Sequence, residues 1–108
     1  MKNARITQLF SFLTKDPTDA FTRYSIAYEY KKLDEHAEAS KHFAILIEEH
    51  PDYLGAYYHY GASLLELDNR EKAELVFEEG MKKARQARDT HALAELQTAY
   101  NNMMYEED

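Results

Sequence analysis

The sequence contains no cysteine and few residues that break helices, and these absences exclude several kinds of protein. Without cysteine there is no disulfide framework, no thiolate metal site and no thiol nucleophile, which suits the reducing cytoplasm. Only three glycines and two prolines interrupt 108 residues, and no Gly-rich loop is available to cradle a phosphate. No apolar run approaches the roughly 18 residues that a membrane helix needs. We therefore expect one cytoplasmic domain over residues 1–108, without a membrane partner.

The charge balance and the spacing of polar residues argue against nucleic acid, metal and catalysis. Thirteen basic and twenty acidic residues leave a net charge of −7, which repels nucleic acid overall. The basic cluster around Lys82 and Arg88 is interpreted as cations near a helix C-terminus. The five histidines show no metal-ligand spacing, and no nucleophile with a matching base can be singled out. We expect no enzyme activity, no catalytic residues, no cofactor and no metal.

What the sequence does contain is apolar residues at intervals of three and four, which predicts helix throughout. Asp19 or Thr18 and, later, Asn69 are expected N-caps, because a short oxygen side chain accepts hydrogen bonds from free helix amides. Asp34 and Asp68 lie at turns that often need a left-handed residue. The predicted helices cover residues 3–15, 19–33, 36–49, 53–67, 70 to beyond 85, and 89–105.

An internal repeat with a period of about 34 residues is the strongest signal in the chain. Pro17 and Pro51 are one such period apart, and the residues before them recur at the same interval. A period of this length predicts stacked helix hairpins, an architecture that commonly binds other proteins. The run Ala39, Phe43, Leu46, Ile47 returns as Ala73, Phe77, Gly80, Met81, and a weaker copy is Arg5, Leu9, Phe12, Leu13.

The repeat resembles the tetratricopeptide repeat family, whose pattern combines a large residue, Leu-Gly, Tyr, Ala-x₃-Phe and Pro. The resemblance implies an all-α, right-handed solenoid of antiparallel hairpins with about six helices, as in small bacterial members with two full repeats. It divides the chain into a leading helix over 3–15, repeats over 20–53 and 54–87, and a capping helix over 89–105. The matching residues are Ile26-Ala27, Tyr30, Ala39, Phe43 and Pro51, then Tyr57, Tyr60-Gly61, Leu64, Ala73 and Phe77.

Three residues depart from the family pattern, and one of them is Arg85, which stands where a third proline would fall, so that the fifth helix is expected to run past it. Arg23 stands where a large aromatic is expected, so the first hairpin either packs more loosely or uses the arginine stem. Gly80 replaces a usual alanine, which is expected to weaken a helix interior by about 1 kcal/mol. The small residues Ala27, Gly61, Ala39 and Ala73 are expected to let helices approach closely, while Phe43 and Phe77 fill the space between hairpins.

The resemblance also implies a concave groove lined by the first helix of each hairpin, here the helices over 19–33 and 53–67. Two interpretations of its tyrosines stay open: a partner covers them, or the terminal helices bury them as core. The expected groove residues are Phe21, Tyr24, Tyr28 and Lys31 on the first helix and Tyr58, His59, Ala62 and Leu65 on the second.

We therefore expect a non-enzymatic adaptor or scaffold that binds a peptide segment of a partner protein in this aromatic groove. The paired asparagines with which one sub-class clamps a C-terminal carboxylate are missing. We therefore expect a proline-rich or amphipathic segment instead. The alternative is a self-associating homodimer, suggested by Met103, Met104 and Tyr105, which we expect to be exposed.

Overall fold

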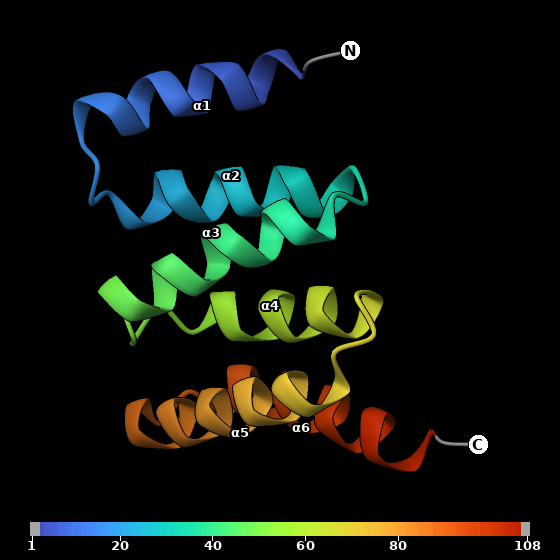
Figure 1. Cartoon of the computed structure of the whole chain (residues 1–108). Helices are drawn as coiled ribbons and strands as arrows, with labels where there is room; N and C mark the ends of the chain where they lie inside the picture. The colour runs from blue at the N-terminus through green and yellow to red at the C-terminus, as the bar shows by residue number, and fades with distance from the viewer. Residues whose placement is uncertain (1–2, 107–108) are drawn as a thin grey trace.

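The computed structural model describes residues 3–106 as a stack of six helices, with α1 and α6 at opposite ends (Figure 1). Each helix packs against the next one along the chain. All regular structure in residues 3–106 is helical, which confirms the all-α prediction; residues 1–2 and 107–108 of the expected domain lie outside the described part. The helices are α1 (Ala4–Lys15), α2 (Ala20–Lys32), α3 (His36–Glu49), α4 (Gly55–Glu66), α5 (Arg70–Ala87) and α6 (Thr90–Tyr105).

Short oxygen side chains begin four of these helices. The Asp19 carboxylate accepts from the Thr22 amide at 2.9 Å and from its hydroxyl at 2.6 Å. These two hydrogen bonds, the hydroxyl's first, hold the pKa of Asp19 below its usual value. Asn69 caps α5 in the same manner, which confirms both predicted caps. Asn3 and Asp89 do the same for α1 and α6.

The turns that close the two hairpins have the left-handed geometry predicted for them. Asp34 and Asp68 both have φ of 61°. Beside Asp34, the Glu35 amide donates to the Tyr30 carbonyl at 2.9 Å, and an equivalent bond recurs one repeat later. A third left-handed residue, Arg88 with φ of 58°, ends α5. Helix α5 therefore runs beyond residue 85, as predicted, and turns at once into α6.

The core lies between successive hairpins and is built as the repeat predicts. Ala27, Ala39 and Ala73 are completely buried, and Phe43 and Phe77 are at most 1% exposed. Helices α4 and α5 leave no room for a side chain at Gly61, because a Cβ atom there would lie 2.3 Å from the ring of Phe77. A smaller cluster of Leu9, Leu13 and Ile26 joins α1 to α2.

Arg23 replaces the expected aromatic by a polar contact within the first hairpin. Its guanidinium lies 3.0 Å from Nδ1 of His42, which is 6% exposed. Arginine can only donate, so this Nδ1 accepts and the proton of the neutral ring is on Nε2. The imidazole stacks on Tyr30 and meets the edge of Phe10. Burial, helped by the Arg23 charge, lowers the pKa of His42 to about 4, so the ring is neutral at pH 7.

Candidate functional site

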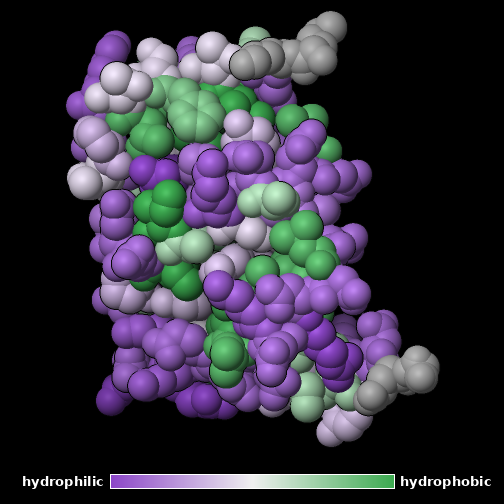
Figure 2. Space-filling view, viewed as in Figure 1, coloured by the Kyte–Doolittle hydropathy of each residue, from purple (hydrophilic) through white to green (hydrophobic). Residues whose placement is uncertain are grey.

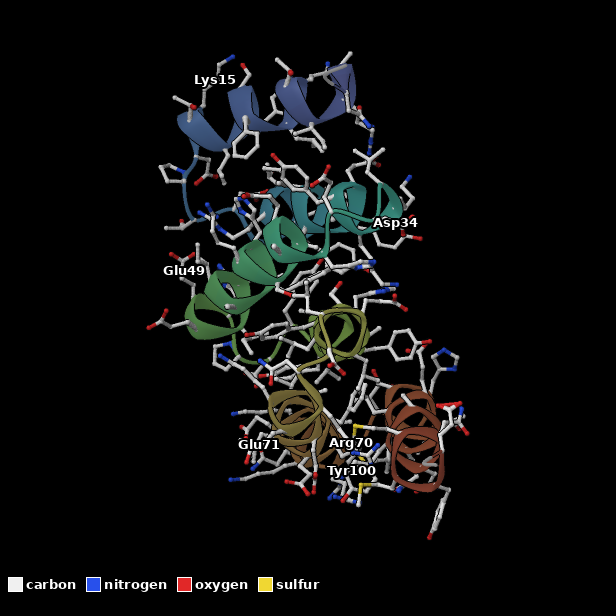
Figure 3. All side chains as sticks on the ribbon, turned by 45° about the vertical axis from the view of Figure 1, so that its right-hand side comes forward. Lys15, Asp34, Glu49, Arg70, Glu71 and Tyr100 are labelled. Carbon is white, nitrogen blue, oxygen red and sulfur yellow. The ribbon has the colours of Figure 1, made fainter. Side chains whose placement is uncertain are left out.

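The first helices of the hairpins, α2 and α4, lie side by side, and α6 continues the row beside α4. In Figure 1, α3 crosses in front of α2 and α5 lies in front of α6; Figure 3 separates α5 from α6. The face seen in Figure 2 is mostly hydrophilic, with small and separate hydrophobic patches. The predicted site residues lie on α2 and α4.

His59 on α4 is the centre of an aromatic cluster that joins α4 to α2. Its ring centroid lies 5.1 Å from that of Tyr28, 5.2 Å from Tyr58 and 6.0 Å from Tyr24. The ring of Phe43 stacks below it at 6.2 Å. Tyr24 and Tyr28, one turn apart on α2, are themselves stacked with centroids 6.1 Å apart. The structure thus brings four of the predicted groove residues into one contact network.

The imidazole of His59 contributes no charge to this surface at pH 7. Burial, with a smaller effect of the Lys31 charge, lowers its pKa to about 4. Its Nδ1 atom is buried and has no hydrogen-bond partner among the described residues. Lys31, which is half-buried, is therefore the charged member of the predicted set.

Tyr24 has both a packing role and a groove position. Its half-buried ring contacts Tyr53 at 5.2 Å and Phe43 at 6.2 Å between centroids. Burial raises the pKa of Tyr24, and the neighbouring Tyr53 and Tyr28 add to the rise. Tyr24 therefore links α2 to α3 and to the segment that precedes α4.

The remaining predicted residues differ in how open they are. Phe21 is 66% exposed and Leu65 37% exposed, whereas Tyr58 and Ala62 are half-buried. Tyr60, predicted to face the core, is only 4% exposed. The aromatic side chains of α2 and α4 are thus neither fully exposed for a partner nor fully buried as core.

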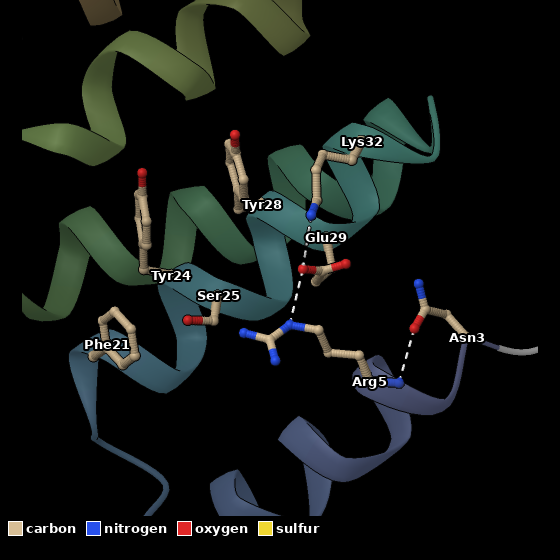
Figure 4. A pocket seen from close by; sticks show the side chains of 8 residues that line it. All are labelled: Asn3, Arg5, Phe21, Tyr24, Ser25, Tyr28, Glu29 and Lys32. Carbon is tan, nitrogen blue, oxygen red and sulfur yellow. Dashed lines mark hydrogen bonds and ion pairs between the residues drawn. The ribbon is translucent and has the colours of Figure 1, made fainter.

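The sequence did not reveal the part of the site that α1 supplies. A pocket of about 540 Å³ lies between α1 and α2, next to Phe21 (Figure 4). Its centre is Glu29, which is 7% exposed and whose Oε2 lies 3.0 Å from Nε of Arg5 and 3.1 Å from Nζ of Lys32. The spacing of Glu29 and Lys32 is visible in the sequence, but the contact with Arg5 depends on how α1 packs. The lining residues outside the predicted set are Asn3, Arg5, Ser25, Glu29 and Lys32.

Two further properties of the described residues bear on the kind of site. Between residues 3 and 106, no three His, Asp or Glu side chains lie close enough together to hold a metal ion. In the same range, every helix is too short or too polar to span a bilayer.

Solved structures identify the family of the chain. A tetratricopeptide repeat domain protein from Salinibacter ruber, solved by crystallography, is 37% identical with a TM-score of 0.77, over 82% of this chain and all of that one. A solution structure of such a domain protein from the same organism is 38% identical with a TM-score of 0.79, over 85% of this chain and 93% of that one. This chain therefore belongs to the tetratricopeptide repeat family.

More distant comparisons agree on the fold. The solution structure of a protein from Bordetella parapertussis has a TM-score of 0.83 at 21% identity, over 98% of this chain and 91% of that one. No family model matches the sequence, and none of the curated proteins does. Repeat folds of this class typically use their concave surfaces to bind other proteins, so protein partners are expected in general.

Proposed function

We propose that this protein is a non-enzymatic interaction module that holds a segment of a partner protein against its concave aromatic face. The observation that supports this most directly is the His59-centred cluster, whose tyrosines stay half-exposed although they belong to a continuous ring network. Beside it, Phe21 is 66% exposed. The groove consists of Phe21, Tyr24, Tyr28, Lys31, Tyr58, His59, Ala62 and Leu65.

The chemistry of the groove favours an apolar or aromatic guest with few charges. Tyrosines present rigid, amphipathic rings that lose little side-chain entropy on binding and are common among interface hot spots. His59 is neutral at pH 7, and the charge that acts on it is that of Lys31. A proline-rich or amphipathic segment matches such a surface, because its apolar side chains cover the rings and its backbone reaches the tyrosine hydroxyls.

The homodimer has less support than the peptide groove. Of the three residues that suggested it, only Tyr105 is exposed, at 83%. Met103 is 3% exposed and belongs to the core, and Met104 is half-buried, so the expectation that all three are exposed is wrong. The reason is the register of α6, which turns Met103 toward the interior together with Leu96.

Affinity capture from the native host tests the proposal, followed by titration of the captured protein against purified variants. Tyr28→Ala combined with Phe21→Ala should weaken binding by roughly 100-fold, since a central anchor is worth about 2 kcal/mol or more. Leu75→Ala is the matched control, because Leu75 is 63% exposed but lies on α5. Thermal unfolding of each variant verifies the fold. Equal binding by the groove variant and the control would contradict the proposal.

A further inference from the structure

By the repeat, α1 corresponds to the second helix of a hairpin, and among residues 3–106 no helix occupies the place of the first. The weak copy of the repeat places α1 in register with α3, and α1 packs on α2 as α3 packs on α4. Three positions that are buried on α3 are exposed to solvent on α1. On α3 these positions are Ala39, His42 and Leu46, which are at most 6% exposed. The equivalent residues of α1 are Arg5, Gln8 and Phe12, which are all exposed.

One repeat later, a helix of this chain fills the space that corresponds to the pocket between α1 and α2. Two positions of α4, Gly55 and His59, are covered by α2: the ring of Tyr24 would lie 3.8 Å from a Cβ at Gly55, and Tyr28 is 5.1 Å from His59 between ring centroids. The equivalents of Gly55 and His59 in the preceding repeat are Phe21 and Ser25. Both line the pocket of about 540 Å³.

We propose that this pocket binds an amphipathic, acidic α-helix of a partner protein. This helix packs against α1 and α2 in the same way as α2 packs against α3 and α4. This rests on the proposed function, since Phe21, Tyr24 and Tyr28 of the groove also line the pocket, and it adds acidic residues to the segment where the segment faces α1. The guest presents two large side chains one turn apart, as Tyr24 and Tyr28 of α2 do. Phe21, which lines the pocket and is 66% exposed, is the apolar surface against which they pack.

The acidic character of the guest follows from the charges around the pocket. Two cations, Arg5 and Lys32, contact the single carboxylate of Glu29. Their side chains are 59% and 52% exposed, so each has hydrogen-bond donors free for a second carboxylate. In Figure 4 the guanidinium of Arg5 lies between Glu29 and Ser25, on the open side of α2. A helix carrying glutamate there gains an ion pair, whereas a basic helix is repelled.

A second copy of this chain does not offer such a helix from its other end. The helix at that end is α6, and its own apolar stripe, including Leu96 and Met103, is already buried against the core. The face left outside carries Thr98, Asn101 and Asn102, all exposed and polar. Tyr105, 83% exposed, is the one large hydrophobic side chain that α6 exposes, so α6 offers no pair of large anchors one turn apart.

The test titrates three synthetic peptides into the ¹⁵N-labelled full chain and follows amide resonances by NMR. The first is an alanine-based helix of about 18 residues with two tyrosines and two glutamates, each pair four residues apart. The second has lysine in place of glutamate, and the third keeps the composition but has a central proline that breaks the helix. We expect the acidic helix to shift resonances of α1 and α2 and to bind roughly tenfold tighter than either control peptide.

Variants of the protein locate the binding. Arg5→Gln and Phe21→Ala, both at exposed positions, should each weaken the acidic helix by roughly tenfold, while Leu75→Ala should leave it unchanged. Equal affinity for the acidic and basic helices overturns the inference, as does tighter binding of the proline-broken peptide. Resonance shifts that are confined to α4 also overturn it. So does light scattering that shows a dimer of the protein which Phe21→Ala abolishes. Capture of a partner that depends on Tyr28 but not on Arg5 would keep the proposed function while rejecting the binding of an acidic helix.

Discussion

Gly80 on α5 lies directly against Tyr57 on α4. A Cβ atom at Gly80 would be 2.7 Å from the Cβ of Tyr57 and 3.1 Å from Cδ1 of Leu96 on α6. Tyr57 is held in place, since it is 1% exposed and its hydroxyl donates to the Pro51 carbonyl at 2.6 Å. Three helices therefore meet at a point where only glycine fits, although the sequence alone suggested a weak point of α5.

Gly80→Ala should accordingly destabilise the protein despite the better helix propensity of alanine. We expect the free energy of unfolding to fall by about 1–3 kcal/mol, because α4 or α6 must move to admit the methyl group. Urea denaturation measures this. Gly55→Ala is the matched control, since its Cβ would meet Tyr24 at an ordinary 3.8 Å. A gain in stability for Gly80→Ala would refute the packing described.

The two phenylalanines on α2 and α3 should respond very differently to truncation. Phe43→Ala removes a completely buried ring and should lower the free energy of unfolding by about 3–5 kcal/mol. Phe21→Ala removes a ring that is 66% exposed and should change it by less than about 0.5 kcal/mol. Thermal unfolding followed by circular dichroism compares them. A large loss of stability for Phe21→Ala would mean that this ring is core.

The left-handed turn after α4 offers a stabilising substitution. Asp68 has φ of 61°, a conformation that glycine adopts without steric strain. Asp68→Gly should raise the free energy of unfolding by about 0.5–1 kcal/mol, whereas Asp68→Ala should lower it by a similar amount. Urea midpoints of the two variants measure the difference. If both substitutions had the same sign, backbone strain would not be the cause.

The buried His42 and the half-buried His59 should make stability depend on pH below neutrality. Burial lowers the pKa of His42 and His59 from the ordinary 6.5 to about 4. Between pH 6.5 and 4 the unfolded chain therefore binds more protons than the folded one, so stability is full above pH 6.5 and falls as the pH drops. Each histidine should account for a loss on the order of 1–2 kcal/mol by pH 5.

Urea denaturation at pH 7.5 and pH 5 measures this loss, and NMR titration of the two imidazoles verifies its origin. His59→Gln should reduce the pH dependence by about half, since it removes one of two equivalent groups. Imidazole resonances that titrate near pH 6.5 in the folded protein would rule out this origin.

The local part of the structure could be predicted because it depends on neighbours in the sequence. Asp19 caps α2 through the amide of Thr22, three residues away, and Asp34 turns the chain because its own backbone is left-handed. The repeat period placed Phe43 and Phe77 in the core for a related reason, since each repeat packs on the next in the same way. The same period led us to expect the groove residues on one face of α2 and of α4.

The site itself depends on contacts that cross helices, and these were not visible beforehand. Arg5 and Glu29 are far apart in the sequence and meet only because α1 packs on α2. His59 was expected near the groove, but its burial among Tyr24, Tyr28 and Phe43 requires the close approach of α4 to α2. The neutrality of that imidazole is a consequence of this burial.

The amino-acid sequence by itself determined the helices, their caps and turns and the family to which the chain belongs, because propensity, hydrogen bonding to near neighbours and a constant period act over short distances along the chain. Only the tertiary structure decided how far the tyrosines are covered, that Gly80 is required, and that α1 leaves a cationic pocket open beside α2. Those properties arise from side chains of different helices competing for one volume, and no local pattern records the outcome of that competition.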